Sequence, residues 1–340
     1  MTQMNKQSGM SLLELMVAMG LGLFLISGVV NVFLSSKDSS QLETSLSRLQ
    51  ENGRVGLDLL VSDIRDANYI GCTSGQANLN VMATGASWTG VLGWERSTTG
   101  WSPTLPASLN GISATNRLGS DVINVQHARP LNTPIAAAVV PGSVSVSVTN
   151  NPECVSKNDS VVIASCVTAH LFRVTNDPAC DGSATTFAYG AASNSITSIE
   201  PGYTVDDELL QFLDKTWYVR DTGRRRTALN IPVYSLFRIV NGIENEMVEG
   251  VEYLQILYGQ ELPSGNFRYV AAGDANLDMA EVVSMRVGML MQSFEPVRDA
   301  RDSTAYQVLD QSIDSTGTTY THNGDLTLRK VFQTTVLFRN

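Results

Sequence analysis

The sequence predicts an α+β fold, in which one long N-terminal α-helix packs on a mainly antiparallel, β-rich globular head. Three observations support this prediction. Residues 15–34 contain no charged side chain, and residues 39–67 place apolar residues at steps of three or four, which is the period of a helix. Beyond Cys72 the pattern becomes an alternation of apolar and polar residues between turn-forming residues, which is typical of strands.

The first half of the helix is apolar enough to enter a lipid bilayer. Residues 15–34 would cross about 30 Å of hydrocarbon as a helix. The polar leader MTQMNKQSG precedes them, and further helix follows in place of the small-residue cleavage site of an ordinary secretory signal. We therefore expect residues 10–35 to form a transmembrane half.

One charge interrupts this apolar segment. Glu14 is the only charged residue between Met10 and Ser36, and a carboxylate inside hydrocarbon costs roughly 2.5–3.5 kcal/mol on insertion scales. Either a partner supplies a cation to Glu14, or the carboxylate lies near the lipid headgroups without a partner.

The second half of the helix, residues 36–70, is expected to be amphipathic and to pack on the head. No proline occurs before Pro103, so one helix is expected from about residue 11 to residue 68, a rod of roughly 85 Å. The apolar stripe consists of Leu42, Leu46, Leu49, Gly53, Leu57, Leu60, Ile64 and Ala67, and the charges expected off the stripe are Arg48, Glu51, Arg54, Asp58 and Asp63.

The head, residues 71–340, is expected to be periplasmic or extracellular. Residues 73–200 are predicted to form a variable, loop-rich part, and residues 201–340, with the longest and most apolar segments, to form its core. Strands are expected at residues 121–128, 143–148, 160–165, 170–174, 216–221, 233–239, 248–259, 282–292 and 330–338.

The cysteines all follow the apolar segment. An even number of cysteines in an exported chain predicts two disulfides, for which three connectivities are open. Buried free thiols are the alternative. The four residues are Cys72, Cys154, Cys166 and Cys180.

Charge and motif content argue against nucleic-acid binding and catalysis. The net charge of −10 repels phosphate backbones. The sequence lacks the GxSxG, GxxxxGK[ST], HExxH and GxGxxG patterns, and its histidines, His127, His170 and His322, are far apart in the chain. We expect a protein that is not an enzyme and that binds no cofactor or metal.

Two acidic segments have ordinary explanations. Asp274 and Asp278 open a D-x-N-x-D pattern, but Met279 and Met285 stand where a calcium-binding EF-hand needs Gly and Glu. We expect a polar loop, with another oxygen-ligand calcium site as the alternative. Residues 206–208, Asp-Asp-Glu, are expected to form a solvated acidic turn or the first turn of a helix.

Two further segments are candidates for contacts. Arg224, Arg225 and Arg226 follow Asp-Thr-Gly and are expected at the end of a hairpin, either solvated or forming salt bridges to an acidic neighbouring subunit. A nucleic-acid contact is the alternative. Trp88, Trp94 and Trp101 are expected to form a satellite apolar cluster under a long loop, with a carbohydrate or partner surface as the alternative.

The leader SGMSLLELMVAMGLGL, residues 8–23, resembles that of type IV prepilins. The resemblance implies that a prepilin peptidase cleaves after Gly9 and that Met10 becomes the N-methylated first residue. It also implies that Glu14, at mature position five, pairs with the N-terminal amine of a neighbouring subunit. Two positions depart from the pattern of major pilins, since Met10 replaces the usual Phe and Asn31 stands where many have a helix-kinking proline.

Three later segments, residues 60–72, 241–259 and 328–340, resemble the PilW family of minor pilins. This resemblance implies a pilin-like fold and a subunit that primes type IV pilus assembly within a tip-associated complex. Its implied location is the bacterial inner membrane, with a periplasmic head, and later the pilus fibre or tip.

The implied partners are prepilin peptidase, other minor pilins, the major pilin, a PilY-type tip adhesin and inner-membrane lipid. A type II secretion pseudopilin and a membrane-tethered periplasmic ligand-binding or adhesive protein are the alternatives.

Overall fold

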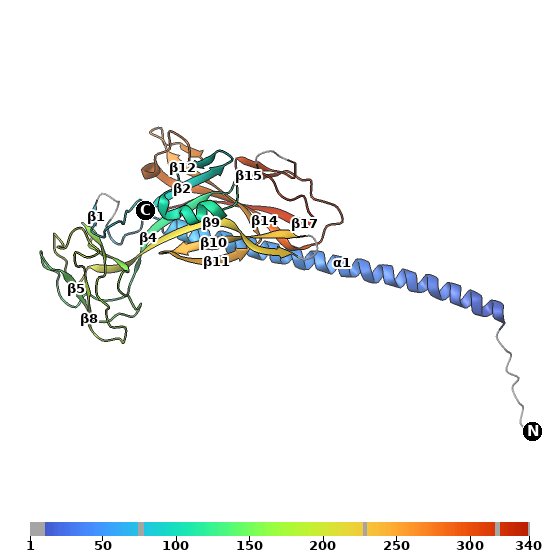
Figure 1. Cartoon of the computed structure of the whole chain (residues 1–340), viewed down its shortest axis with the longest axis horizontal. Helices are drawn as coiled ribbons and strands as arrows, with labels where there is room; N and C mark the ends of the chain where they lie inside the picture. Colours follow the sequence, from blue (N-terminus) through green and yellow to red (C-terminus); the bar gives the residue numbers. More distant parts are fainter. Residues whose placement is uncertain (1–10, 74–77, 227–229, 317–319, 339–340) are drawn as a thin grey trace, which may run out of the picture.

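The computed structural model describes residues 11–73, 78–226, 230–316 and 320–338. Helix α1 (Leu12–Arg65) has 54 residues, about 80 Å at the usual rise, and projects from the head (Figure 1). It ends earlier than expected because strand β4 (Val122–Pro130) binds the backbone that follows, where the Asn68 N–H donates to the Gln126 carbonyl at 3.0 Å. Asn68 itself has φ +67°.

The larger sheet of the head is nine-stranded and built around the long strand β9 (Glu208–Arg226). Strand β1 (Leu79–Val81) pairs in parallel with β7 (Ala169–Arg173), whereas the other pairs are antiparallel. The remaining strands are β2 (Val91–Ser97), β3 (Gly100–Ser102), β4 (Val122–Pro130), β6 (Ser160–Ala164), β10 (Ile231–Val240) and β11 (Ile243–Glu249).

The second sheet is antiparallel, in the order β13-β12-β14-β17. Its strands are β12 (Val251–Glu261), β13 (Phe267–Val270), β14 (Val282–Pro296) and β17 (Thr327–Leu337). Two small pairs, β5 (Ser145–Val148) with β8 (Thr185–Ala188) and β15 (Tyr306–Val308) with β16 (Gln311–Ile313), complete the strands. In the described ranges, the short helices are η2 (Ala107–Leu109), α2 (Asn110–Thr115) and η4 (Met279–Glu281).

The α+β prediction is confirmed, and each of the nine segments expected to be extended contains a strand. One of them, residues 248–259, was expected to be a single strand and is divided at Gly250. The Gly250 N–H donates to the Tyr234 carbonyl of β10 at 2.8 Å, and its carbonyl accepts from the Gln292 N–H of β14 at 2.7 Å. Gly250 has φ +90°, and at this residue the chain crosses from the first sheet to the second.

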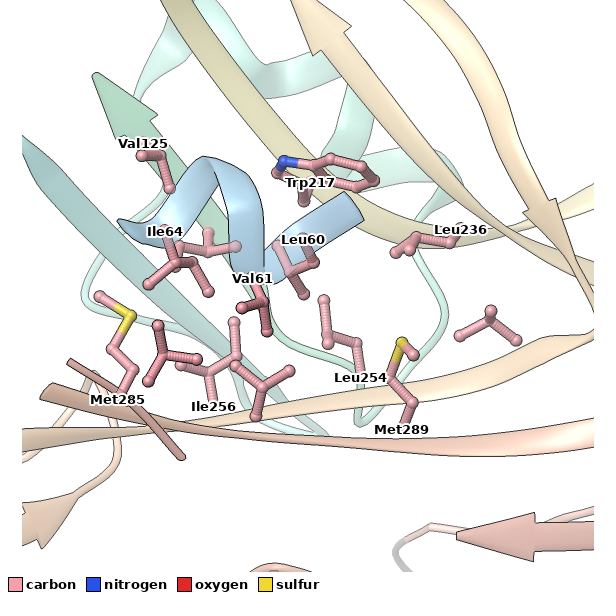
Figure 2. Packing of buried hydrophobic residues seen from close by; sticks show 14 of the residues in the cluster. Leu60, Val61, Ile64, Val125, Trp217, Leu236, Leu254, Ile256, Met285 and Met289 are labelled. Carbon is pink, nitrogen blue, oxygen red and sulfur yellow. The ribbon is translucent and has the colours of Figure 1, made fainter. Parts of the chain in front are cut away.

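The C-terminal half of α1 lies between the two sheets. Leu60, Val61 and Ile64 face Trp217 and Leu236 on one side (Figure 2). On the other side they face Leu254, Ile256, Met285 and Met289 of the second sheet. Fully burying a side chain of this size contributes about 1.5–3 kcal/mol, so this cluster anchors the helix in the head.

The predicted apolar stripe is covered along only part of its length. Leu49, Leu60 and Ile64 are buried, whereas Leu42 and Leu46 are each 40% exposed. The helix is therefore in contact with the head from about Ser45 onward.

Two disulfides fix the part of the head farthest from the N-terminus, where β5 and β8 lie (Figure 1). Cys72 pairs with Cys166 in the β6–β7 turn, and Cys154 pairs with Cys180. The prediction of two disulfides is confirmed, and the structure selects one of the three open connectivities. The first bond links the segment that follows α1 to a hairpin 94 residues away.

Asp121, just before β4, is expected to make stability fall with rising pH. Its Oδ2 accepts from the Ile256 N–H at 2.8 Å, while its Oδ1 has no hydrogen-bond partner among the described residues. Burial, reinforced by the charges of Glu95 and Asp310, raises the pKa of this carboxyl well above the ordinary 3.8. A group whose folded pKa is raised contributes stability below its unfolded pKa, and this contribution is lost as pH rises.

We therefore expect Asp121→Asn, which keeps an acceptor oxygen, to stabilise the protein at pH 8 by about 1–3 kcal/mol and to have little effect at pH 4. Urea unfolding of the full chain in detergent measures both values. Asp299→Asn, at an exposed position, is the control. An equal effect of Asp121→Asn at the two pH values would contradict the explanation.

Candidate functional site

The N-terminal part of α1 exposes apolar side chains on all its faces. Among the described residues, α1 is the one helix that is both long enough and apolar enough to cross a membrane. None of the residues in its most apolar window is buried against the head. Leu12 and Phe24, for example, are 79% and 77% exposed. An apolar surface of this extent indicates contact with lipid or with other protein.

Glu14 closes the first turn of this helix. The Glu14 N–H donates to Ser11 Oγ at 3.2 Å, and the Ser11 N–H donates to Glu14 Oε2 at 3.1 Å. This reciprocal pair is a capping box, which satisfies two backbone donors and places a negative charge at the positive end of the helix dipole. This capping role was not among the predictions, although the S-x-x-E spacing is its sequence signal. Gly9 and Met10 lie outside the described residues.

Small residues let α1 approach the second sheet closely. A Cβ added to Gly53 would lie 2.5 Å from the ring of Phe332 in β17, and one added to Gly56 would lie 3.1 Å from Met289 Cε in β14. The Phe332 ring thus occupies the space above Gly53, which explains why the stripe carries glycine at this position.

Asp63 was predicted to lie off the packed face, and that prediction is wrong. The residue is 5% exposed. Its Oδ1 accepts from Lys215 Nζ at 2.6 Å, and its Oδ2 accepts from Trp217 Nε1 at 3.0 Å and lies 3.5 Å from Arg238 Nη1. A buried carboxylate is tolerated when cations and hydrogen-bond donors compensate it. Those groups come from β9 and β10, so the helical period alone did not indicate them.

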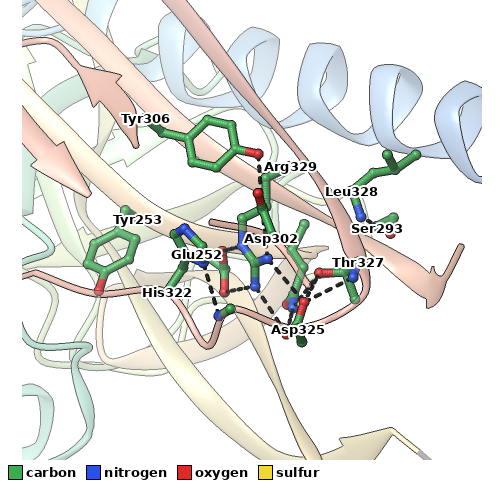
Figure 3. A network of polar contacts seen from close by, with 12 residues as sticks. Glu252, Tyr253, Ser293, Asp302, Tyr306, His322, Asp325, Thr327, Leu328 and Arg329 are labelled. Atoms are coloured by element: carbon green, nitrogen blue, oxygen red, sulfur yellow. Dashed lines mark hydrogen bonds and ion pairs between the residues drawn. The ribbon is translucent and has the colours of Figure 1, made fainter. Parts of the chain in front are cut away.

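A buried ionic network fixes the C-terminal strand (Figure 3). Arg329 of β17 donates through Nε to Glu252 of β12 at 2.7 Å, and its Nη1 lies 3.3 Å from Asp302 and 3.0 Å from Asp325. Burial alone would lower the pKa of Arg329, but the charge and hydrogen bonds of Glu252 and Asp325 raise it. Burial likewise opposes ionisation of Asp325, yet the hydrogen bond and charge of Arg329 hold its pKa below the ordinary value. Arg329 and Asp325 therefore stay ionised at neutral pH.

The arginine segment lies at a hairpin end, as expected, because Arg226 is the last residue of β9 and pairs with Ile231, the first residue of β10. Arg225 is opposite Pro232 of β10, and the register shifts between Pro232 and Tyr234, so Asp-Thr-Gly forms an irregularity within the strand. Arg224 pairs with Glu246 and Glu249 of β11. The other two arginines are also engaged within the chain, Arg225 with Asp221 at 2.8 Å and buried Arg226 with the Ser293 carbonyl.

The acidic segments serve local structure. Asp207 accepts from the Thr204 N–H at 2.6 Å, so Asp206 and Asp207 lie in the predicted turn. Glu208 is the first residue of β9, and the alternative of a helix start is wrong. Asp274 accepts from the Asn276 N–H at 2.8 Å, and Asp278 caps η4 through the Ala280 N–H at 2.9 Å. In the part of the chain that the structure describes, no group of three or more His, Cys, Asp or Glu is arranged to hold a metal.

The tryptophans and histidines do not converge on one place. Trp94 and Trp101 share one apolar cluster, whereas Trp88 packs on Phe212 in another, with ring centroids 5.6 Å apart. The single satellite cluster expected from the sequence is thus two clusters. Among the histidines, His170 bonds to Tyr203 at 2.6 Å and His322 to the Thr304 carbonyl at 2.9 Å, while His127 lies beside the end of α1.

Comparison with protein families finds two matches. Residues 205–340 match the family described as type IV pilus-assembly protein W, and residues 4–30 match the prokaryotic N-terminal methylation motif. No curated protein matches the chain. The resemblance inferred from the leader and from residues 241–259 and 328–340 is thereby confirmed, while residues 60–72 fall outside both matches.

Proposed function

Because the chain carries a type IV pilus-assembly protein W domain together with an N-terminal methylation motif, we propose that it is a minor pilin. It is a non-enzymatic subunit that primes assembly of a type IV pilus and takes its place in a tip-associated complex with other minor pilins and the major pilin. The observation that carries the proposal is the exposed apolar stretch of α1, headed by Glu14, on the same chain as this domain.

Processing would create the partner that Glu14 requires. In the proposed pathway, prepilin peptidase removes residues 1–9 after Gly9 and methylates the new amine of Met10. A carboxylate offers about four lone-pair positions, so Glu14 can keep the Ser11 N–H on one oxygen and accept the amine of a neighbouring subunit on the other. Desolvation offsets much of the Coulomb energy of such a pair. The pair therefore fixes the register between neighbouring subunits more than it stabilises their contact.

The head covers only the C-terminal part of α1 and leaves the N-terminal part exposed, which suits a membrane-bound precursor. Residues 12–34 would lie in the inner membrane and the head in the periplasm. The stretch between them, residues 35–44, is exposed and would hold the head about 15 Å from the hydrocarbon. A PilY-type tip adhesin remains a proposed partner. Deletion of the gene distinguishes the minor pilin from the nearest alternative, a type II secretion pseudopilin. Loss of a minor pilin would remove surface pili, whereas loss of a pseudopilin would abolish secretion.

The mass of the N-terminal peptide tests the proposal. We expect protein from native membranes or sheared surface filaments to begin at N-methyl-Met10, because the methylation-motif match covers this segment. A peptide beginning at Met1 or Thr2, in cells with active prepilin peptidase, would overturn the minor pilin assignment. Mass spectrometry of a strain without the peptidase is the control and should return only the uncleaved N-terminus.

A further inference from the structure

A cleft of about 800 Å³ with a mixed polar and apolar lining opens beside the C-terminal end of α1. Its lining combines the helix end with strands β4, β9, β10 and β11. Three charged side chains meet at its inner end, because Lys215 and Arg238 both contact Asp63. Exposed Ile243 and half-exposed Tyr69 also border the cleft, so an occupant could contact apolar groups beside the charged ones.

Two buried polar atoms on this lining have no hydrogen-bond partner among the described residues. They are His127 Nε2 and Arg238 Nε. His127 is only 5% exposed, and a buried polar atom left without a partner costs about 1–3 kcal/mol. Such atoms on the wall of an open cleft indicate a ligand that supplies their missing partners.

The charges that meet at Asp63 leave one cation in excess, which favours an anionic ligand at this point of the cleft. Both oxygens of Asp63 are already occupied, by Lys215 on one side and by Trp217 and Arg238 on the other. One carboxylate therefore faces two cations whose side chains are 12% and 25% exposed. A further carboxylate would balance the second cation and give Arg238 Nε its acceptor.

The remaining charged groups on the lining are Asp66, Arg129 and Asp159. Arg129 pairs with Glu153 at 2.9 Å, and Asp159 accepts from the Ser156 N–H at 2.9 Å. Asp66, at the end of α1, acts on His127 through its charge and favours the protonated imidazole.

We propose that this cleft receives an aspartate or glutamate side chain from a segment of a partner protein, held by Arg238, Lys215 and His127. The assignment goes beyond the proposed minor pilin role, since it concerns a docking surface of the head and holds whichever assembly the chain joins. The carboxylate accepts from Arg238 Nε and Lys215 Nζ, and it accepts from His127 Nε2 once that nitrogen carries a proton.

Proton uptake should accompany docking. Burial, together with the charge of Lys215, lowers the pKa of His127 to about 4, against the opposing charges of Asp63 and Asp66. The imidazole is thus neutral at pH 7 in the free protein. A bound carboxylate favours the imidazolium, so affinity rises as pH falls toward the free pKa, by up to about tenfold per pH unit.

Two matched peptides test the inference on the full chain in detergent. The probe is acetyl-Leu-Glu-Leu-amide and its control is acetyl-Leu-Gln-Leu-amide, and NMR of the histidine ring signals reports both binding and protonation. The chain has only three histidines, so His127→Gln assigns the signal. We expect the Glu peptide to bind at least tenfold more tightly than the Gln peptide at pH 5.5, with the preference falling toward pH 7.5.

Variants separate the roles of the side chains. Arg238→Gln should abolish the preference for the Glu peptide, and His127→Gln should retain binding but remove its pH dependence. Arg301→Gln, at an exposed position, should change neither, and near-ultraviolet circular dichroism checks that each variant is folded. Equal binding of the two peptides, or no shift of the His127 signal at any pH, would overturn the proposal, whereas the N-terminal processing result would stand.

Discussion

Replacing Arg329 by methionine is expected to destabilise the head by about 3–5 kcal/mol, because Glu252 and Asp325 lose the cation to which they are hydrogen-bonded. The side chains of Arg329, Glu252 and Asp302 are all fully buried. Arg117 lies 4.0 Å from Glu252 and is stacked between Tyr234 and Tyr253, so it does not replace the bonds that Arg329 makes. Arg329→Lys should have an intermediate effect, since lysine keeps the charge but cannot reach several carboxylates at once.

Guanidinium unfolding of the full chain in detergent measures this loss. The matched control is Lys330→Met at the next, exposed position, which should change the unfolding free energy by less than about 0.5 kcal/mol. The pKa of Asp302 and that of Asp325 lie below the ordinary 3.8, so their contribution is present above that pH and is lost as pH falls. Parent and Arg329→Met should therefore converge in strong acid. A loss of unfolding free energy under 1 kcal/mol at pH 7 would mean that the network is not the main interaction that holds β17 in the head.

Replacing Gly250 by alanine is expected to cost about 2–4 kcal/mol. Its positive φ disfavours any L side chain, and an added Cβ would lie 2.7 Å from the Gln292 carbonyl oxygen. That oxygen belongs to the backbone of β14 and cannot rotate away. Relief of the clash would break the hydrogen bonds that hold Gly250 between the two sheets.

Gly242→Ala is the matched control for Gly250→Ala. Gly242 has nearly the same φ, +89°, but nothing lies within 4 Å of the added Cβ. It should cost only about 1–2 kcal/mol, the backbone part of the effect. The difference between the two variants in the unfolding free energy measures the clash, and equal losses would show that the close approach to β14 is unimportant.

The sequence was informative wherever a structure depends on local periodicity. The uncharged run and the apolar stripe predicted α1, and alternation predicted the strands on both sides of Gly250. The break at Gly250 was not visible, because apolar residues flank it and both neighbouring strands are extended. The continuation of β9 through Asp-Thr-Gly as far as Arg226 was missed for a related reason, since Asp-Thr-Gly is a turn signal that also suits an irregular strand.

Features that depend on distant partners were not predictable. Asp63 looked like a surface charge because Lys215 is 152 residues away, and Arg329 showed no sign of Glu252, 77 residues before it. The disulfide pairing was open for the same reason. At the candidate site, Glu14 was identified from its apolar surroundings, while its capping role needed only the spacing from Ser11. The cleavage and methylation assigned to Gly9 and Met10 remain predictions.

The position of α1 between the two sheets determines how the head would respond to tension. A pull on the free end of the helix reaches the head at about Ser45 and runs parallel to the buried interface, so it loads the contacts with β14 and β17 together in shear. Contacts loaded in this way resist until many yield at once, whereas peeling would open them one after another. The Cys72–Cys166 bond lies just beyond the far end of α1, so covalent linkage would carry the load if the noncovalent interface slipped.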